Sequence, residues 1–208
     1  MRATIVMPIV AAAALYLVAC GGASYRLTST HVEPAATPKP IRDPLIIVVV
    51  DDQQIRGIFE NHFKDWFKVK GVEAITSVDV LPIQKDSQLE EEAIVAVVDK
   101  YENDSVLITH LVGFGETDVF SRGTPQVYHN YYSFYRYAWG YVHWPVITGE
   151  NVQFTLETRL YSVSTESLLW AGESLLTNPE TTGKAIGQVV ESVIKALDKN
   201  GLLPKRPS

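Results

Sequence analysis

Residues 45–52 read Leu-Ile-Ile-Val-Val-Val-Asp-Asp, and the rest of the predicted fold is built around them. Its six apolar residues, most of them β-branched, predict a strand that is buried on both faces of a sheet. Asp51 and Asp52 end the strand, and we expect Asp52 to cap a following helix. Two adjacent carboxylates are also the kind of group that holds a hard cation. We favour the helix cap over the cation.

A helix pattern begins directly after Asp52. Apolar residues recur at spacings of three and four, which predicts one apolar stripe along a helix that ends near Gly71. The stripe consists of Ile55, Ile58, Phe59, His62, Phe63, Trp66 and Phe67. Residues 72–81 follow as a second predicted strand, and Pro82 ends it.

A second helix and a third strand come next. Ser87-Gln88-Leu89-Glu90 matches a capping box, so we expect a helix from there to about Tyr101. Residues 105–112 are mostly apolar and predict another strand. The resulting order, β-α-β-α-β, builds a sheet with right-handed crossovers.

The second half of the chain alternates apolar and polar residues instead. Residues 152–161 predict a strand with one buried and one wetter face, and residues 168–177 return as its partner. Asn178-Pro179 reads as the start of a last helix, which Gly201 ends. The apolar side of that helix carries Ile186, Val189, Val190, Val193, Ile194 and Leu197.

The predicted fold class is therefore α/β. We expect a single domain over residues 45–203 with a mixed β-sheet: β-α-β-α-β, then an antiparallel hairpin and a C-terminal helix. An aromatic-rich insert occupies about residues 120–148, and residues 204–208 form a tail.

The insert has the most unusual composition in the chain. Tyr131, Phe134 and Tyr135 have helical spacing, whereas Tyr135, Tyr137, Trp139 and Tyr141 alternate as in a strand. Tyrosine and tryptophan suit protein partners, sugars and membrane interfaces because they join a large apolar area to a polar tip. In the other interpretation, these side chains cover the domain's own core. The candidate binding surface is Tyr131, Tyr135, Tyr137, Trp139, Tyr141 and Trp144.

The amino terminus reads as an export signal. After Arg2, residues 4–19 are almost wholly apolar and end in a small residue before Cys20. The run is too short for a comfortable membrane span, which needs about 20 apolar residues. An uncleaved anchor helix that ends by chance in cysteine is the alternative.

Leu17-Val18-Ala19-Cys20 resembles the lipobox of bacterial lipoproteins. The resemblance implies that residues 1–19 are a signal peptide, cleaved before Cys20, and that Cys20 carries fatty acids such as palmitate. Two or more acyl chains anchor a protein stably. Gly21 follows where an aspartate would signal inner-membrane retention, so the resemblance implies a periplasm-facing anchor on the cell outer membrane.

Residues 20–44 contain Pro34, Pro38, Pro40 and Pro44. Because proline-rich segments are semi-rigid and extended, we interpret residues 20–44 as the lipidated amino terminus and a tether. The alternative is that Tyr25-Arg26-Leu27 packs on the domain as an extra edge segment.

Composition argues against several classes of function. The chain has 208 residues and a net charge of −6, without a long basic run, so nothing predicts nucleic-acid binding. Cys20 is the only cysteine, and the five histidines lack metal-ligand spacing, so we predict no disulfide, metal or cofactor. No nucleophile–base motif supports an enzyme.

Glu157, Arg159 and Glu173 predict a cross-strand charge cluster on the outer face of the last hairpin, either a surface ion-pair ladder or a docking surface.

Several short motifs resemble an uncharacterised family of proteobacterial envelope lipoproteins. They are Arg56-Gly57-Ile58-Phe59-Glu60, Gly71-Val72-Glu73-Ala74, Leu156-Glu157-Thr158-Arg159-Leu160-Tyr161 and Leu169-Trp170-Ala171-Gly172-Glu173-Ser174. The layout is also similar to the amino-terminal domain of the Tol-system periplasmic protein and to auxiliary envelope lipoproteins. Those proteins are partners in assembly and transport, so the resemblance implies a binding protein rather than an enzyme.

The sequence therefore predicts a membrane-anchored bacterial lipoprotein without catalytic activity. We expect it to bind another cell-envelope component through the aromatic surface. The alternative is a periplasmic lipoprotein that binds a glycan or small ligand, with Trp139, Tyr141 and Trp144 as stacking platforms.

Overall fold

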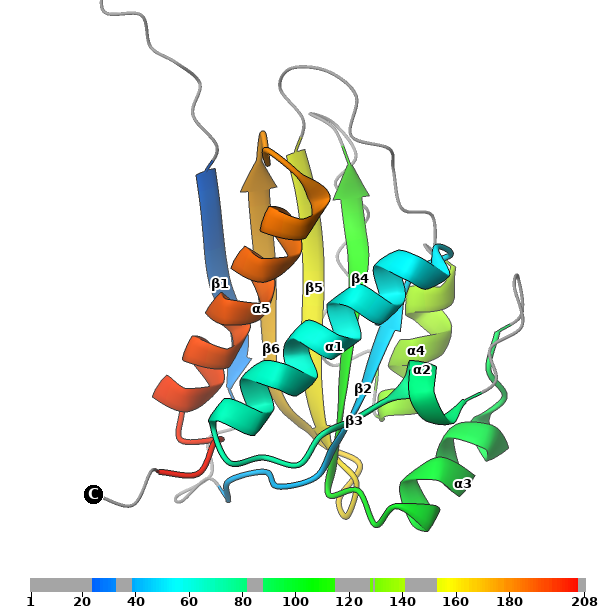
Figure 1. Ribbon diagram of the computed structural model, residues 1–208. Helices are drawn as coiled ribbons and strands as arrows, with labels where there is room; N and C mark the ends of the chain where they lie inside the picture. Colours follow the sequence, from blue (N-terminus) through cyan, green and yellow to red (C-terminus); the bar gives the residue numbers. More distant parts are fainter. Residues whose placement is uncertain are drawn as a thin grey trace, which may run out of the picture.

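The computed structural model describes residues 24–32, 39–81, 88–114, 128, 130–140 and 153–205. Within these residues the chain forms a six-stranded sheet of order β1-β6-β5-β4-β2-β3 (Figure 1). Strand β2 runs parallel to β3 and β4, and the other neighbouring strands are antiparallel. Helices cover both faces, which confirms the predicted α/β class with a mixed sheet.

The strands are β1 (Ser24–Val32), β2 (Pro44–Val49), β3 (Ile75–Thr76), β4 (Ser105–Phe114), β5 (Gln153–Ser162) and β6 (Leu168–Thr177). The helices are α1 (Gln53–Val69), α2 (Ser77–Val80), α3 (Glu91–Lys100), α4 (Tyr131–Trp139) and α5 (Thr182–Lys199). No helix in these described ranges is long and apolar enough to cross a membrane.

The stretch that opens the fold behaves as predicted. Every residue of β2 is buried. Asp52 caps α1, because its carboxylate accepts hydrogen bonds from the backbone N–H groups of Gln54 (2.8 Å) and Ile55 (3.0 Å). Gly71, with a φ of 75°, takes the left-handed conformation that ends the helix.

Among the described residues, no group of three or more His, Cys, Asp or Glu side chains could hold a metal ion.

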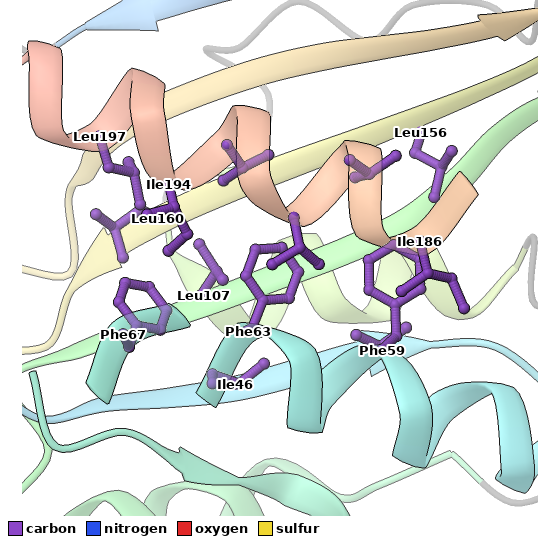
Figure 2. Close-up of a cluster of buried hydrophobic side chains, with 14 of the residues drawn as sticks. Ile46, Phe59, Phe63, Phe67, Leu107, Leu156, Leu160, Ile186, Ile194 and Leu197 are labelled. Atoms are coloured by element: carbon purple, nitrogen blue, oxygen red, sulfur yellow. The ribbon is translucent and has the colours of Figure 1, made fainter. Parts of the chain in front are cut away.

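Helices α1 and α5 cover one face of the sheet, in front of the strands in Figure 1. Figure 2 shows the core between them, where three phenylalanines of α1 point toward α5 and the strands. The rings of Phe59 and Phe63 lie 5.8 Å apart, and those of Phe63 and Phe67 lie 6.3 Å apart. All six residues predicted for the apolar side of α5 are buried.

The predicted stripe of α1 needs one correction. Ile58 is 38% exposed, whereas Arg56 and Glu60 are buried. These two charges face each other across one helical turn, with Arg56 Nε 3.0 Å from Glu60 Oε1. Ser77 completes the network, since its hydroxyl donates to Glu60 (2.6 Å) and accepts from Arg56 (2.6 Å).

The same network explains why residues 72–81 are not one long strand. Only β3, two residues long, pairs with β2, and the chain then turns into the short helix α2. Glu60 accepts a hydrogen bond from the backbone N–H of Val78 (2.8 Å) as well as from Ser77. The buried carboxylate takes donors from the start of α2, and this turns the backbone away from an extended path.

Two predicted helix starts also differ. Helix α3 begins after Glu90, which makes no side-chain cap, and Ser87 of the predicted capping box lies outside the described residues. Helix α5 begins at Thr182, not at Pro179. Thr181 caps it by accepting a hydrogen bond from Lys184 N (3.2 Å).

The predicted tether does not hold for most of its described residues. Residues 24–32 form β1, an edge strand paired antiparallel with β6, as the alternative interpretation proposed for Tyr25-Arg26-Leu27. Ile41 is buried, and its N–H donates to Leu202 O (3.0 Å). The prolines did not prevent this strand because the first of them, Pro34, comes after β1 has ended.

Candidate functional site

Helix α4 is formed by residues 131–139 of the aromatic insert and lies behind the sheet in Figure 1. Asn130 begins the helix, because its side chain accepts a hydrogen bond from Ser133 N (2.9 Å) in a capping box. The helix buries Tyr131, Phe134, Tyr135 and Ala138 on β2 and β4. The helical spacing is therefore the correct one for these residues.

The structure divides the six predicted binding residues. Tyr131 and Tyr135 are only 7% and 1% exposed, so they belong to the core and not to a binding surface. Tyr137 and Trp139 are half-buried. Tyr141 and Trp144 lie outside the described residues.

Tyr135 has a structural role in the described fold. Its hydroxyl accepts a hydrogen bond from the backbone N–H of Leu89 (2.9 Å), which ties α4 to the segment before α3. Burial raises the pKa of the Tyr135 hydroxyl to about 12, which the hydrogen bond from Leu89 only partly offsets. The hydroxyl is therefore neutral at physiological pH.

A charged cluster lies beneath α4, and we call it the His110 cluster: His110, Glu157, Arg159 and Tyr161. His110 and Glu157 are partners on the adjacent strands β4 and β5. His110 Nε2 lies 3.3 Å from Glu157 Oε2, and Arg159 reaches Glu157 Oε1 with Nε (2.8 Å) and Nη2 (2.8 Å). Arg159 Nη1 also donates to the Tyr161 hydroxyl (3.4 Å).

Aromatic rings enclose this cluster. The Arg159 guanidinium lies 4.2 Å from the centroid of the Phe134 ring and 5.1 Å from that of Tyr128. The His110 ring meets Phe134 (5.2 Å) and Tyr137 (5.6 Å) edge-on. A desolvated cation over an aromatic face is stabilised by about 2 kcal/mol. The charges thus hold α4 on the sheet.

The electrostatics of the cluster are those of a strong ion pair. Burial on its own raises the pKa of Glu157, but the His110 hydrogen bond and the Arg159 charge outweigh it, so the net pKa lies below its usual range. Burial lowers the pKa of Arg159, and the negative charge of Glu157 more than reverses this. Burial also raises the pKa of Tyr161 to about 12. Glu157 is therefore ionised and Arg159 charged at neutral pH.

A histidine beside a carboxylate is two thirds of a catalytic triad. The third member would be a hydroxyl or thiol at the other ring nitrogen. Here His110 Nδ1 is buried and has no hydrogen-bond partner among the described residues. In the described part of the chain, no hydroxyl or thiol completes such a triad at this nitrogen.

The sequence placed part of this cluster incorrectly. Arg159 is buried, so Glu157, Arg159 and Glu173 are not a ladder on an outer surface. Glu157 does lie opposite Glu173 in the β5–β6 register, and its side chain is 18% exposed. His110 was missed as the partner of Glu157. The available signal was a polar residue inside an otherwise apolar strand.

The predicted lipidation site, Cys20, lies outside the described residues. The first described residue, Ser24, begins β1 and pairs with Thr177. The chain therefore enters the sheet four residues after Cys20.

No protein-family model matches the chain, and no curated protein matches it. Two solved structures of PelC from Paraburkholderia phytofirmans, both described as dodecamers and one of them a point variant, are similar to it. The variant has 12% sequence identity and a TM-score of 0.47. The second structure has 10% identity and a TM-score of 0.45. Each alignment covers 88% of this chain and 100% of the other chain.

Proposed function

We propose that this chain is a membrane-anchored bacterial lipoprotein that binds another cell-envelope component and has no catalytic activity. The observation that carries the proposal is the sequence Leu17-Val18-Ala19-Cys20 directly ahead of the folded domain. Gly21 after the cysteine supports a periplasm-facing position on the outer membrane.

The placement of the reactive side chains supports a binding role. Glu60 and Glu157 are each neutralised by an arginine within the core. Arg56 and Arg159, the two arginines concerned, are almost fully buried. Within the described residues, Arg56 pairs with Glu60 and Arg159 pairs with Glu157.

We assign the partner contact to the half-buried aromatic side chains of α4: Tyr132 and Trp139, which are seven residues apart on one side of the helix, and Tyr137 on its other side, with Tyr141 and Trp144 following in the sequence. The first three are half-buried, so each packs part of its ring on the domain and leaves part in solvent. Side chains of this kind lose little conformational entropy when a partner covers them. The buried Tyr131 and Tyr135 pack α4 on the domain.

Photo-crosslinking in intact cells tests the proposal. A photoreactive amino acid at Trp139 or Tyr132 should capture one discrete envelope protein. Tyr101 provides the matched control, since it is an aromatic residue, 39% exposed, just beyond the end of α3. Capture of the same species from Tyr101, or of none from either test position, would contradict the proposal.

A second experiment distinguishes a protein partner from a glycan ligand. A Trp139→Phe variant and the unsubstituted domain can be titrated with cell-wall fragments while tryptophan fluorescence is recorded. The proposal predicts no saturable change in either protein. A saturable fluorescence change that disappears in Trp139→Phe would contradict a protein partner and would support glycan binding at Trp139.

A further inference from the structure

The short distance between Cys20 and β1 limits how the domain can sit on a membrane. Gly21-Gly22-Ala23 separate Cys20 from Ser24, the first residue of the strand. A fully extended chain spans at most about 3.6 Å per residue, so Ser24 lies within about 14 Å of the lipidated residue.

Ser24 lies at one defined end of the sheet. Thr177, the last residue of β6, pairs with both Ser24 and Gln153, the first residue of β5. Phe114, the last residue of β4, pairs with Phe154. Figure 1 shows these strand ends together at the top, with the start of α5 beside them. We call this the Ser24 end.

The β5–β6 turn lies at the opposite end of the sheet. Strand β5 has ten residues and ends at Ser162. At about 3.3 Å per residue, its two ends are about 33 Å apart. Residues 21–23, which we call the leash, reach less than half of that length. The domain therefore cannot invert so that the β5–β6 turn contacts the lipid and the Ser24 end points away from it.

Strand β1 is firmly joined to the rest of the sheet. It pairs with β6 along its length, with one register shift between Ser29 and His31. The Tyr25 hydroxyl lies 3.1 Å from Ser174 Oγ, and Tyr25 and Leu27 pack on the core beneath α5. Ser24 therefore has a fixed position relative to the sheet, and an anchor at Cys20 constrains the orientation of the whole domain.

We infer that the Ser24 end faces the lipid surface at short range, and that the β5–β6 turn projects away from it. The inference rests on the proposed lipidation of Cys20 and adds the orientation of the domain. The contact requires no recognition of lipid headgroups. Asp52 and Thr181 already accept hydrogen bonds from backbone amides in the first turns of α1 and α5, the two helices that begin at this end.

Energy transfer to labelled lipid measures the orientation. Because acylation occupies the only natural cysteine, one introduced cysteine carries the dye in the mature lipoprotein. Glu180→Cys labels an exposed position at the Ser24 end, and Thr165→Cys labels an exposed position in the β5–β6 turn. Each protein is reconstituted in phosphatidylethanolamine–phosphatidylglycerol vesicles that carry an acceptor dye on the headgroup.

We expect several-fold more energy transfer from position 180 than from position 165. Inserting twenty Gly and Ser residues between Gly22 and Ala23 lengthens the leash by about 25 Å on average, and should remove most of this difference. Equal transfer from the two positions, or a difference that survives the insertion, overturns the inference. Loss of vesicle association by the wild-type chain would contradict the proposed function itself, so the two failures are distinct.

Discussion

The two faces of the sheet are stabilised by different physical means. Helices α1 and α5 cover one face with an almost wholly aliphatic and phenylalanine core. Helices α3 and α4 cover the other face, where aliphatic side chains are joined under α4 by an ion pair, a histidine and several tyrosines. The contact between α1 and α5 is held by non-directional apolar burial, whereas the contact between α4 and the His110 cluster depends on defined partners and distances. The faces should therefore respond differently to substitution.

The largest expected effect is on the apolar face. Phe63→Ala should lower the free energy of unfolding by about 3–5 kcal/mol, because it leaves a cavity among side chains that cannot collapse to fill it. Chemical denaturation of the mature domain measures the change. Ile58→Ala on the same helix is the control, since Ile58 is 38% exposed and should cost far less. Similar losses in the two variants would show that this face is not the packed core described.

The α4 face should be sensitive to the loss of one charge and tolerant of the loss of both. Arg159→Met leaves the Glu157 carboxylate, whose side chain is only 18% exposed, without its arginine partner, and should cost about 3 kcal/mol. Adding Glu157→Leu to that variant should restore much of the loss, since no unpaired charge then remains. Additive losses in the double variant would contradict an ion pair between these residues.

Gly172 of β6 lies opposite Ser29 of the edge strand β1. A Cβ at this position would lie 2.3 Å from Trp170 Cη2 and 3.3 Å from Leu27 Cδ1 of β1. Gly172→Ala should therefore cost about 1–3 kcal/mol through overpacking. Gly187→Ala is the control, because its Cβ meets nothing within 4 Å and α5 gains a better helix former. Equal denaturation midpoints for the two variants would be inconsistent with this packing.

The smallest expected effect is a difference in pH dependence. The folded-state pKa of Glu157 lies below its ordinary value of 4.5, so its ionised form favours folding. This stabilisation is fully present above the unfolded pKa and is lost as the pH falls through the folded pKa. Wild type should exceed Glu157→Gln in unfolding free energy near pH 7, and the gap should narrow below about pH 4.5. If the difference in unfolding free energy between the two proteins did not change with pH, it would not come from ionisation of Glu157. Asp79, whose pKa is lowered by Lys64, leaves an acid dependence in both proteins.

The same contrast explains which parts of the fold were predictable. The strands β2, β4, β5 and β6 and the buried side of α5 follow directly from apolar periodicity, because burial imposes that period. Asp52 was predictable for a similar reason, since a helix cap is a local property of the chain.

The remaining features depend on contacts between distant residues. Residues 72–81 have the composition of a strand, but Glu60 draws the backbone of Val78 into a helical turn. His110, Glu157 and Arg159 are brought together by the β4–β5 register, which spacing along the chain does not reveal. Tyr131 and Tyr135 read as surface residues because aromatic enrichment is the same in a core and in an interface.

Strand β1 forms an edge of the sheet, and it is the described element that lies nearest in the sequence to the proposed anchor at Cys20. We propose that the mature chain begins at a lipidated Cys20 and passes directly into this strand. Intact mass spectrometry of the protein extracted from membranes identifies both the first residue of the chain and its acylation. We predict a chain that begins at Cys20 and carries the added mass of fatty acyl groups, and a Cys20→Ser variant that keeps residues 1–19 and carries no acyl group. A wild-type protein that begins elsewhere, or that has a free thiol at Cys20, would contradict the account.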